Sequence, residues 1–199
     1  MKATGTARIL TLAGASGVGK TTIARALAME FPTYIEVADA NPQLQKFLKN
    51  DPAFNASANQ NWFLNQYDSA LASAIPTAPL VLDQDPIGVV RVYARLFHEQ
   101  QSLSSNDYAL LLVRLLNLES RILDWSGGRI MLLLDAPADV LHERVRQRGY
   151  RRTPPLEWFE MLRTYFARLT DGIPSVHRIS TSEHSIEFVV ALARSLLQV

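Results

Sequence analysis

Apolar positions along the chain fall into short continuous runs that alternate with longer segments of helical spacing. The continuous runs predict strands at about 8–13, 33–37, 80–83, 130–134 and 176–180. Apolar residues recurring every three or four positions predict helices at about 20–30, 41–50, 59–74, 87–100, 104–125, 138–148, 155–169 and 185–197. Strands that alternate with helices and are mostly apolar indicate an α/β fold, with a parallel sheet covered by helices on both faces.

The segment after the first strand carries the clearest chemical signal. Residues 14–21 read GASGVGKT and match the phosphate-binding pattern G-x-x-x-x-G-K-[S/T] at every fixed position, between a predicted strand and a predicted helix. The glycines allow backbone N–H groups to converge on a phosphate at a helix N-terminus. We expect Lys20 to reach the β- and γ-phosphates of ATP and the Thr21 hydroxyl to hold Mg²⁺. The residues predicted to bind ATP are Gly14, Ala15, Ser16, Gly17, Val18, Gly19, Lys20, Thr21 and Thr22.

Three carboxylates stand at the carboxyl ends of predicted strands, where ligands bind in open α/β sheets. Glu36 is a candidate base for the proton of an attacking hydroxyl, and a surface charge is the alternative. Asp83 and Asp135 are alternative ligands for Mg²⁺. Asp135 lies just before a predicted helix and can cap it, whereas a polar loop follows Asp83. We therefore assign the metal to Asp83.

Five arginines surround a glycine and two prolines in the segment 144–155. Arg144 and Arg148 are four residues apart and share one helix face, so they can clamp the oxygens of a transferring phosphoryl group. The alternative is a solvated basic face paired with Glu143 or Glu157. The clamp interpretation predicts a small arginine-rich lid over this segment.

Amide and aromatic side chains gather on the helices after the second and third strands. Sites for a flat heteroaromatic ring typically combine an amide with aromatic side chains, so Gln60 and Tyr93 are candidates to bind such a ring. Phe63 and Phe97 also lie there, but aromatic residues at helical spacing are interpreted more simply as core packing.

The composition of the chain excludes several classes of protein. The chain has 199 residues, a formal net charge of +1 and no cysteine, which excludes disulfides and a cysteine nucleophile and gives no sign of a nucleic-acid polymer or a membrane surface as partner. No apolar run approaches the ~20 residues of a membrane span, and the first residues lack a signal-peptide core. We expect one cytoplasmic domain with a phosphate-binding loop over 1–199, acting on a small molecule.

The order of these motifs resembles the deoxynucleoside kinase family over nearly the whole chain. The runs that carry the resemblance are 14–22, 36–44 (EVADANPQL), 47–52 (FLKNDP), 60–64 (QNWFL), 83–85 (DQD), 143–149 (ERVRQRG) and 156–158 (LEW). Many enzymes share the phosphate loop, but far fewer proteins contain all of these runs in this order.

The resemblance implies a P-loop NTPase fold with a five-stranded parallel sheet, and transfer of the γ-phosphoryl group of ATP to the 5′-hydroxyl of a deoxynucleoside. By position, Glu36 would be the base, Gln60 would hydrogen-bond the nucleobase and Tyr93 would stack on it. Asp83 matches the acidic residue of an Asp/Glu-Arg-Ser motif, and the pair Arg144 and Arg148 matches lid arginines. Family members commonly dimerise through helices like the leucine-rich 104–125, which implies a homodimer.

Several acceptor-side residues depart from the family pattern. Gln84 replaces the arginine of the Asp-Arg-Ser motif and is therefore expected beside the acceptor. Tyr67 stands where a second arginine is usual, and Val89 where an aspartate often holds the base. The tyrosine expected near 48–49 and the acidic pair after the lid arginines are absent. Two alternatives therefore stay open: a kinase for another hydroxyl or phosphate acceptor, and a non-catalytic nucleotide-binding regulator.

Overall fold

A five-stranded, wholly parallel sheet forms the centre of the computed structural model, which describes residues 8–75, 77–125, 127–149, 153–169, 173 and 175–198. The strand order is β2-β3-β1-β4-β5. The strands are β1 (Ile9–Ala13), β2 (Thr33–Tyr34), β3 (Leu80–Leu82), β4 (Arg129–Asp135) and β5 (Val176–Ser180). The predicted α/β fold with a five-stranded parallel sheet is confirmed.

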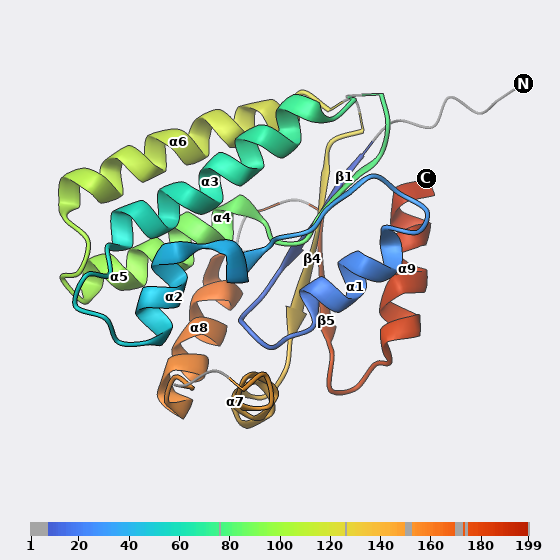
Figure 1. Ribbon diagram of the computed structural model, residues 1–199. Helices are drawn as coiled ribbons and strands as arrows, with labels where there is room; N and C mark the ends of the chain where they lie inside the picture. Colours follow the sequence, from blue (N-terminus) through green and yellow to red (C-terminus); the bar gives the residue numbers. More distant parts are fainter. Residues whose placement is uncertain are drawn as a thin grey trace, which may run out of the picture.

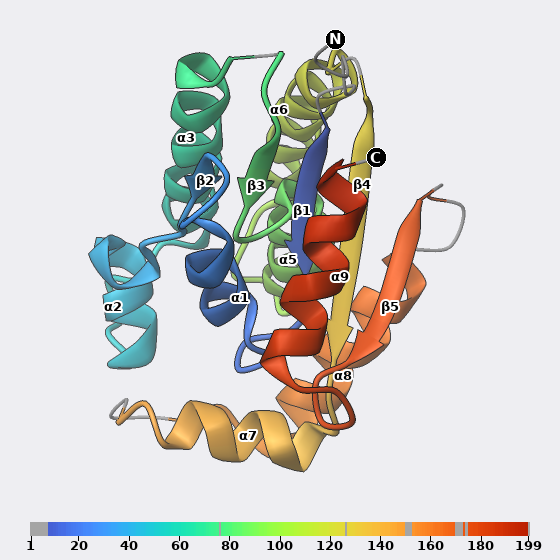
Figure 2. The same ribbon diagram turned by 90° about the vertical axis from the view of Figure 1, so that its right-hand side faces the viewer.

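Helices cover both faces of this sheet (Figure 1). On one face α1 (Lys20–Leu27) packs against α9 (Ile186–Gln198). The other face carries α3 (Ala56–Ser73), α6 (Ser105–Leu123) and α8 (Leu156–Leu169). Helix α7 (Ala138–Arg146) crosses below the carboxyl ends of the strands (Figure 2). No helix in the described ranges is both long and apolar enough to cross a lipid bilayer.

The register of the strands decides which loops meet at the site. Ala13 pairs with Leu133 across β1 and β4, and Tyr34 pairs with Leu82 across β2 and β3. The residues that follow β1, β2 and β3 therefore leave the sheet at the same edge. Strand β1 is fully buried, because it has a neighbour on each side and helices on both faces. This buried sheet is a rigid base for the loops at its carboxyl edge.

Asparagine and serine side chains set the beginnings of three helices. Asn41 accepts hydrogen bonds from two backbone N–H groups at the start of α2 (Pro42–Leu48). Asn55 caps α3, which therefore begins three residues before the predicted start. Ser104 caps α6, as its capping pattern predicts.

The segment predicted as one helix over 87–100 has three parts. A short α4 (Pro86–Gly88) leads into a π-helical segment, η2 (Val89–Ala94), and α5 (Arg95–Glu99) follows. A π-helical turn changes the direction of the side chains relative to an α-helix and is often found at functional sites. The remaining short helix, η1 (Ala38–Ala40), lies between β2 and α2.

Candidate active site

The phosphate loop between β1 and α1 has a backbone that requires glycine. Gly14 has φ 137°, and a Cβ placed on it would lie 2.3 Å from the carbonyl oxygen of Leu134. Gly19 has φ 102° where α1 begins, with no neighbouring atom within 4 Å of an added Cβ, so only its backbone conformation favours glycine there. The loop thus leaves the N-terminal N–H groups of α1 at the carboxyl edge of the sheet, in the arrangement that binds phosphates.

Lys20 folds back over this loop. Its Nζ donates hydrogen bonds to the carbonyl oxygens of Gly14, at 2.8 Å, and Ala15, at 3.1 Å. Burial lowers the pKa of Lys20 to about 8, although the carboxylates of Glu36 and Asp83 oppose this shift. The ammonium group is therefore mostly protonated at neutral pH and stands where phosphate oxygens would replace the carbonyl groups as its partners.

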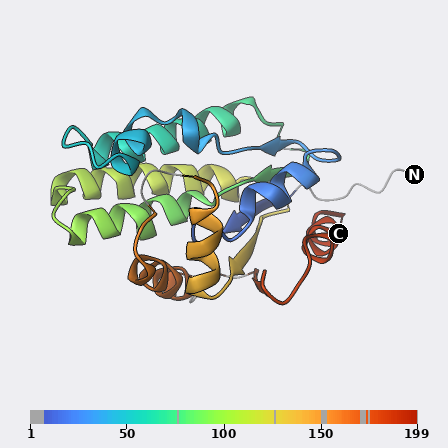
Figure 3. The same cartoon turned by 60° about the horizontal axis from the view of Figure 1, so that its bottom comes forward.

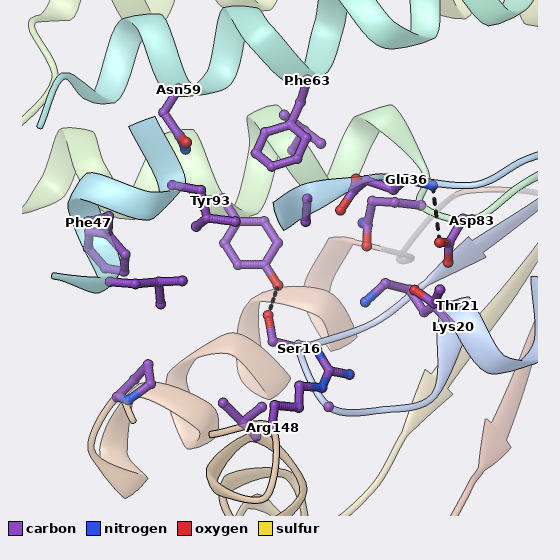
Figure 4. Close-up of a pocket in the computed structure, with 18 of the residues that line it drawn as sticks. Ser16, Lys20, Thr21, Glu36, Phe47, Asn59, Phe63, Asp83, Tyr93 and Arg148 are labelled. Carbon is purple, nitrogen blue, oxygen red and sulfur yellow. Dashed lines mark hydrogen bonds between the residues drawn. The ribbon is translucent and has the colours of Figure 1, made fainter. Parts of the chain in front are cut away.

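Glu36 faces the phosphate loop from the end of β2 (Figure 4). Its Oε2 accepts a 3.0 Å hydrogen bond from the hydroxyl of Tyr67, a fully buried residue of α3. Its backbone N–H donates to Oδ2 of Asp83 at 3.2 Å. Lys20 and Glu36 line the same cavity. The structure thus brings the predicted base and the phosphate loop together.

The carboxyl group of Glu36 has an unusual environment for an acid. Burial raises its pKa from 4.5 to about 7, and the nearby charge of Asp83 adds to this. Lys20 and the hydrogen bond from Tyr67 act in the opposite direction. A carboxyl group with a pKa near neutrality is well suited to accept a proton and to release it again.

This raised pKa predicts that Glu36 weakens the unliganded fold at high pH. Between the unfolded pKa of 4.5 and the folded pKa of about 7, the folded state keeps a proton that the unfolded state has lost, so stability falls as pH rises. Glu36→Gln removes this loss. We expect thermal unfolding to show the variant a few degrees more stable than the parent at about pH 8, with the difference vanishing towards pH 4.5. A difference independent of pH would contradict the assigned environment.

Asp83 and Thr21 form a candidate Mg²⁺ site at the same edge of the sheet. Asp83 is 1% exposed, and its Oδ1 is buried without a hydrogen-bond partner among the described residues. Burial raises the pKa of Asp83, whereas Lys20 and the adjacent Thr21 hydroxyl oppose the shift. An unpartnered carboxylate oxygen beside a hydroxyl suits Mg²⁺, which takes one or two protein ligands and otherwise water and phosphate oxygens. Within the described ranges, no group of three or more acidic, His or Cys side chains could hold a metal.

Asp135, the alternative candidate for an Mg²⁺ ligand, is paired with an arginine. Both of its carboxylate oxygens accept hydrogen bonds from Arg163 of α8, at 2.8 and 2.7 Å. The residue before α7 is Pro137, and no side chain caps this helix. The interpretation of Asp135 as a helix cap is therefore wrong, because the residue instead ties β4 to α8.

A largely apolar cavity of about 190 Å³ extends from the phosphate loop. Aromatic rings of α2, α3, α5 and α8 form much of its wall, and the amides of Asn59, Gln60 and Gln84 supply polar groups. Phe63 and Phe97, predicted as core residues, are indeed at most 9% exposed, yet both also line this cavity. A ring that faces a buried cavity has the same sequence spacing as a ring that faces the core.

Gln60 and Tyr93, the predicted ring-binding residues, both reach this cavity. Gln60 is 1% exposed, and its Oε1 has no hydrogen-bond partner among the described residues. Tyr93 projects from η2, and its hydroxyl lies 3.2 Å from that of Ser16 in the phosphate loop (Figure 4). Gln84 is also buried against the cavity, and its Nε2 donates to the carbonyl oxygen of Asp85 at 3.3 Å.

The lid arginines are placed differently from one another. Arg148 lines the cavity and points towards the phosphate loop (Figure 4). Arg144 instead donates to the side chain and carbonyl oxygens of Thr181, each at 3.1 Å, after β5. Arg146 pairs with Glu143 on the surface, at 2.7 Å, as in the alternative interpretation. The predicted lid residues 150–152 lie outside the described residues.

A second hollow adjoins the phosphate loop on the side of Arg144. It is lined by Gly19 and Thr22 together with both Arg144 and Arg148, and by His184 from the loop after β5. The structure therefore brings Arg148 to both hollows, but Arg144 only to the second.

Two further residues of the site were not assigned a role from the sequence. The amide of Asn59 lines the cavity while its Oδ1 accepts a 2.9 Å hydrogen bond from Asn41. The sequence suggests no link between Tyr67 and the base, and the contact of Tyr67 with Glu36 joins residues 31 positions apart. Such a contact leaves no local signal in the sequence.

Comparison with protein families and with curated proteins gives two results. A family model described as deoxynucleoside kinase matches residues 10–191. No curated protein matches the chain.

Among solved structures, deoxyadenosine kinase from M. mycoides with bound dATP is 16% identical with a TM-score of 0.74, covering 97% of this chain and 100% of that one. The same kinase with bound dCTP is 16% identical with a TM-score of 0.73, covering 94% of this chain and 99% of that one. At this identity the likeness shows the fold alone, whereas the family model spans most of the sequence. The chain therefore belongs to the deoxynucleoside kinase family and is a phosphotransferase.

Proposed function

We propose that this kinase transfers the γ-phosphoryl group of ATP to the 5′-hydroxyl of a nucleoside. The observation that carries the proposal is that Lys20 and Glu36 line one cavity whose far end is apolar and aromatic. A sugar hydroxyl at the near end would lie between the base and the phosphates. A nucleobase would occupy the far end, beside the amide of Gln60 and the ring of Tyr93.

The reaction follows from these positions. The 5′-oxygen forms a bond to the γ-phosphorus, the bond from that phosphorus to the β–γ bridging oxygen breaks, and ADP leaves. Glu36 accepts the proton of the hydroxyl. Lys20 and the loop N–H groups hold the β- and γ-phosphates, and Arg148 contacts the group in transfer. Mg²⁺, held by Thr21 and Asp83, would neutralise charge on the phosphates.

We place the adenosine of ATP in the hollow beside Arg144. This hollow adjoins the phosphate loop at Thr22 and is separate from the acceptor cavity. The hydrogen bonds from Arg144 to Thr181 join α7 to the loop after β5. Arg144 thus supports the donor site, whereas Arg148 is the arginine placed to meet the transferring group.

A screen of acceptors tests this proposal. ATP consumption would be followed with deoxynucleosides, ribonucleosides, nucleoside monophosphates and simple alcohols, each with Mg²⁺. We expect turnover with nucleosides and none with 5′-deoxyadenosine, which lacks the acceptor hydroxyl. Turnover confined to monophosphates or simple alcohols would replace the proposed acceptor, and ATP binding without turnover would favour a regulatory protein.

Tyr67 is predicted to position the base. Tyr67→Phe removes the hydrogen bond to Glu36 and preserves the packing of the ring. Because a hydrogen bond to a charged group contributes about 1.5–3 kcal/mol, we expect kcat to fall roughly 10- to 100-fold with KM for ATP unchanged. Tyr34→Phe is the matched control, since the Tyr34 ring meets Tyr67 edge-on at 5.4 Å but its buried hydroxyl has no partner among the described residues. Equal effects in both variants would refute this role.

We also propose that the protein is a homodimer formed through α6. One face of this helix buries its leucines in the core, while Leu110, Val113, Leu116 and Leu123 are each at least 56% exposed. A row of exposed apolar residues along a helix is typical of an interface between subunits.

Charge on this face should separate the subunits. We expect Val113→Asp with Leu116→Asp to give a monomer in light scattering, because a buried charge in a dimer interface is costly. Met29→Asp changes a residue that is 84% exposed outside α6 and should leave the dimer intact. A parent protein that is already monomeric would end the dimer proposal.

A further inference from the structure

A third concave site lies apart from the acceptor cavity and from the hollow beside Arg144, where η2 and α5 meet α6 and α8. These elements lie together in Figures 1 and 3. The hollow has a volume of about 330 Å³. Its lining includes Arg91, Arg95, Tyr108, Leu112, Tyr165 and Arg168.

Positive charge in this hollow exceeds the negative charge around it. Arg95 pairs with Glu99 at 2.8 Å. In the described part of the chain, no carboxylate forms an ion pair with Arg91 or Arg168. Guanidinium groups gathered in one concavity repel each other unless an anion lies between them. The hollow is therefore charged in a way that favours an anionic ligand.

Two aromatic contacts hold the hollow in shape. The guanidinium carbon of Arg95 lies 5.0 Å from the ring centre of Tyr165, whose hydroxyl donates to Glu99. The ring of Tyr108 stacks on His98, with centroids 5.1 Å apart and planes 14° apart. The walls are thus fixed by contacts that leave Arg91 and Arg168 available to a ligand.

We infer that this hollow binds a phosphate monoester. Planar guanidinium groups bind phosphate oxygens through paired hydrogen bonds, and the hydroxyl of Tyr108 can donate a further one. The tyrosine rings and Leu112 offer a surface for the organic group that carries the phosphate. This ligand is distinct from the ATP and nucleoside of the proposed reaction, which occupy hollows at the phosphate loop.

The hollow shares its elements with the acceptor cavity. Arg91 lies two residues before Tyr93 on η2, and Tyr165 precedes Phe166 on α8. The rings of Tyr93 and Phe166 meet edge-on, 6.0 Å apart. A phosphate that bridges Arg91 and Arg168 therefore ties together the two elements whose aromatic residues meet beside the acceptor cavity.

Calorimetric titration of the full chain with phenyl phosphate and with inorganic phosphate tests this site. We expect two binding events in the parent protein, one at the phosphate loop and one at the hollow. Arg91→Gln with Arg168→Gln should weaken the second event at least tenfold and leave the first. Lys46→Gln with Lys49→Gln removes the same amount of charge from the C-terminal end of α2 and the residue after it, and should change neither event. Thermal unfolding checks the fold of each variant.

Comparison of the two ligands distinguishes a site for a phosphate monoester from a site for free phosphate. Tighter binding of phenyl phosphate than of inorganic phosphate supports a monoester, whereas equal binding identifies the hollow as a site for free phosphate and overturns the monoester assignment. Arg91→Lys with Arg168→Lys keeps the charge but loses the paired geometry and should weaken binding partially. Unchanged titration curves in the glutamine double variant would overturn the site altogether.

Discussion

Glu36→Gln is expected to lower kcat by about 10²- to 10⁴-fold, the usual contribution of a positioned general base. Glutamine has nearly the shape of glutamate and can still accept the hydrogen bond from Tyr67. It cannot take a proton from the acceptor hydroxyl. Because Glu36 does not hold the phosphates in this account, the dissociation constant of ATP should change little. Rapid-quench kinetics and ATP titration measure the two effects separately.

Glu160→Gln is the control for this variant, since Glu160 is exposed on α8 and belongs to neither hollow at the phosphate loop. It should keep the parental kcat. If Glu36→Gln also kept it, another group would have to accept the proton and Glu36 would lose its assigned role. Glu36→Gln should also be more stable than the parent at alkaline pH. Thermal unfolding can therefore exclude unfolding as the cause of its lost activity.

Lys20→Ala is expected to abolish measurable phosphoryl transfer. Removal of one preorganised group that stabilises the transition state typically costs about 10²–10³ in kcat. Lys20 would in addition hold the β- and γ-phosphates in the ground state, so the affinity for ATP should fall as well. The nearby carboxylates of Glu36 and Asp83 would then lie without this cation. Equilibrium binding of a fluorescent ATP analogue, together with initial rates, measures both losses.

Lys49→Ala removes an exposed lysine after α2 and controls for a general loss of positive charge. Its activity and ATP affinity should match those of the parent. Comparable transfer by the Lys20 and Lys49 variants would show that the loop does not position the donor.

The sheet, the phosphate loop and the edge that holds the site could be predicted because each depends on local sequence. Continuous apolar runs give buried strands, and GASGVGKT fixes a loop through its glycines. Parallel strands then bring the residues after β1, β2 and β3 to one edge. Glu36 can therefore be placed opposite Lys20 from the strands alone, without knowing where any helix packs.

Other features depend on contacts between distant residues. Asp135 pairs with Arg163, 28 residues later, so its local pattern resembled a helix cap. Tyr93 lies beside Ser16 and belongs to the π-helical segment η2. The apolar spacing of this segment predicts a regular α-helix and gives no sign of the π-helical turn. The spacing of Arg144 and Arg148 predicts one shared helix face, but α7 ends at Arg146 and Arg148 lies beyond it. Only the folded chain shows that Thr181 engages Arg144.

The proposed reaction requires a nucleoside 5′-hydroxyl to lie between Glu36 and the phosphates held by the loop. Product analysis tests this directly, after incubation of the protein with Mg²⁺, γ-labelled ATP and a mixture of deoxynucleosides. We expect the label on the 5′-oxygen of a deoxynucleoside monophosphate, in amounts equal to the ADP formed. Label found only in inorganic phosphate, or on another oxygen of the nucleoside, would contradict it.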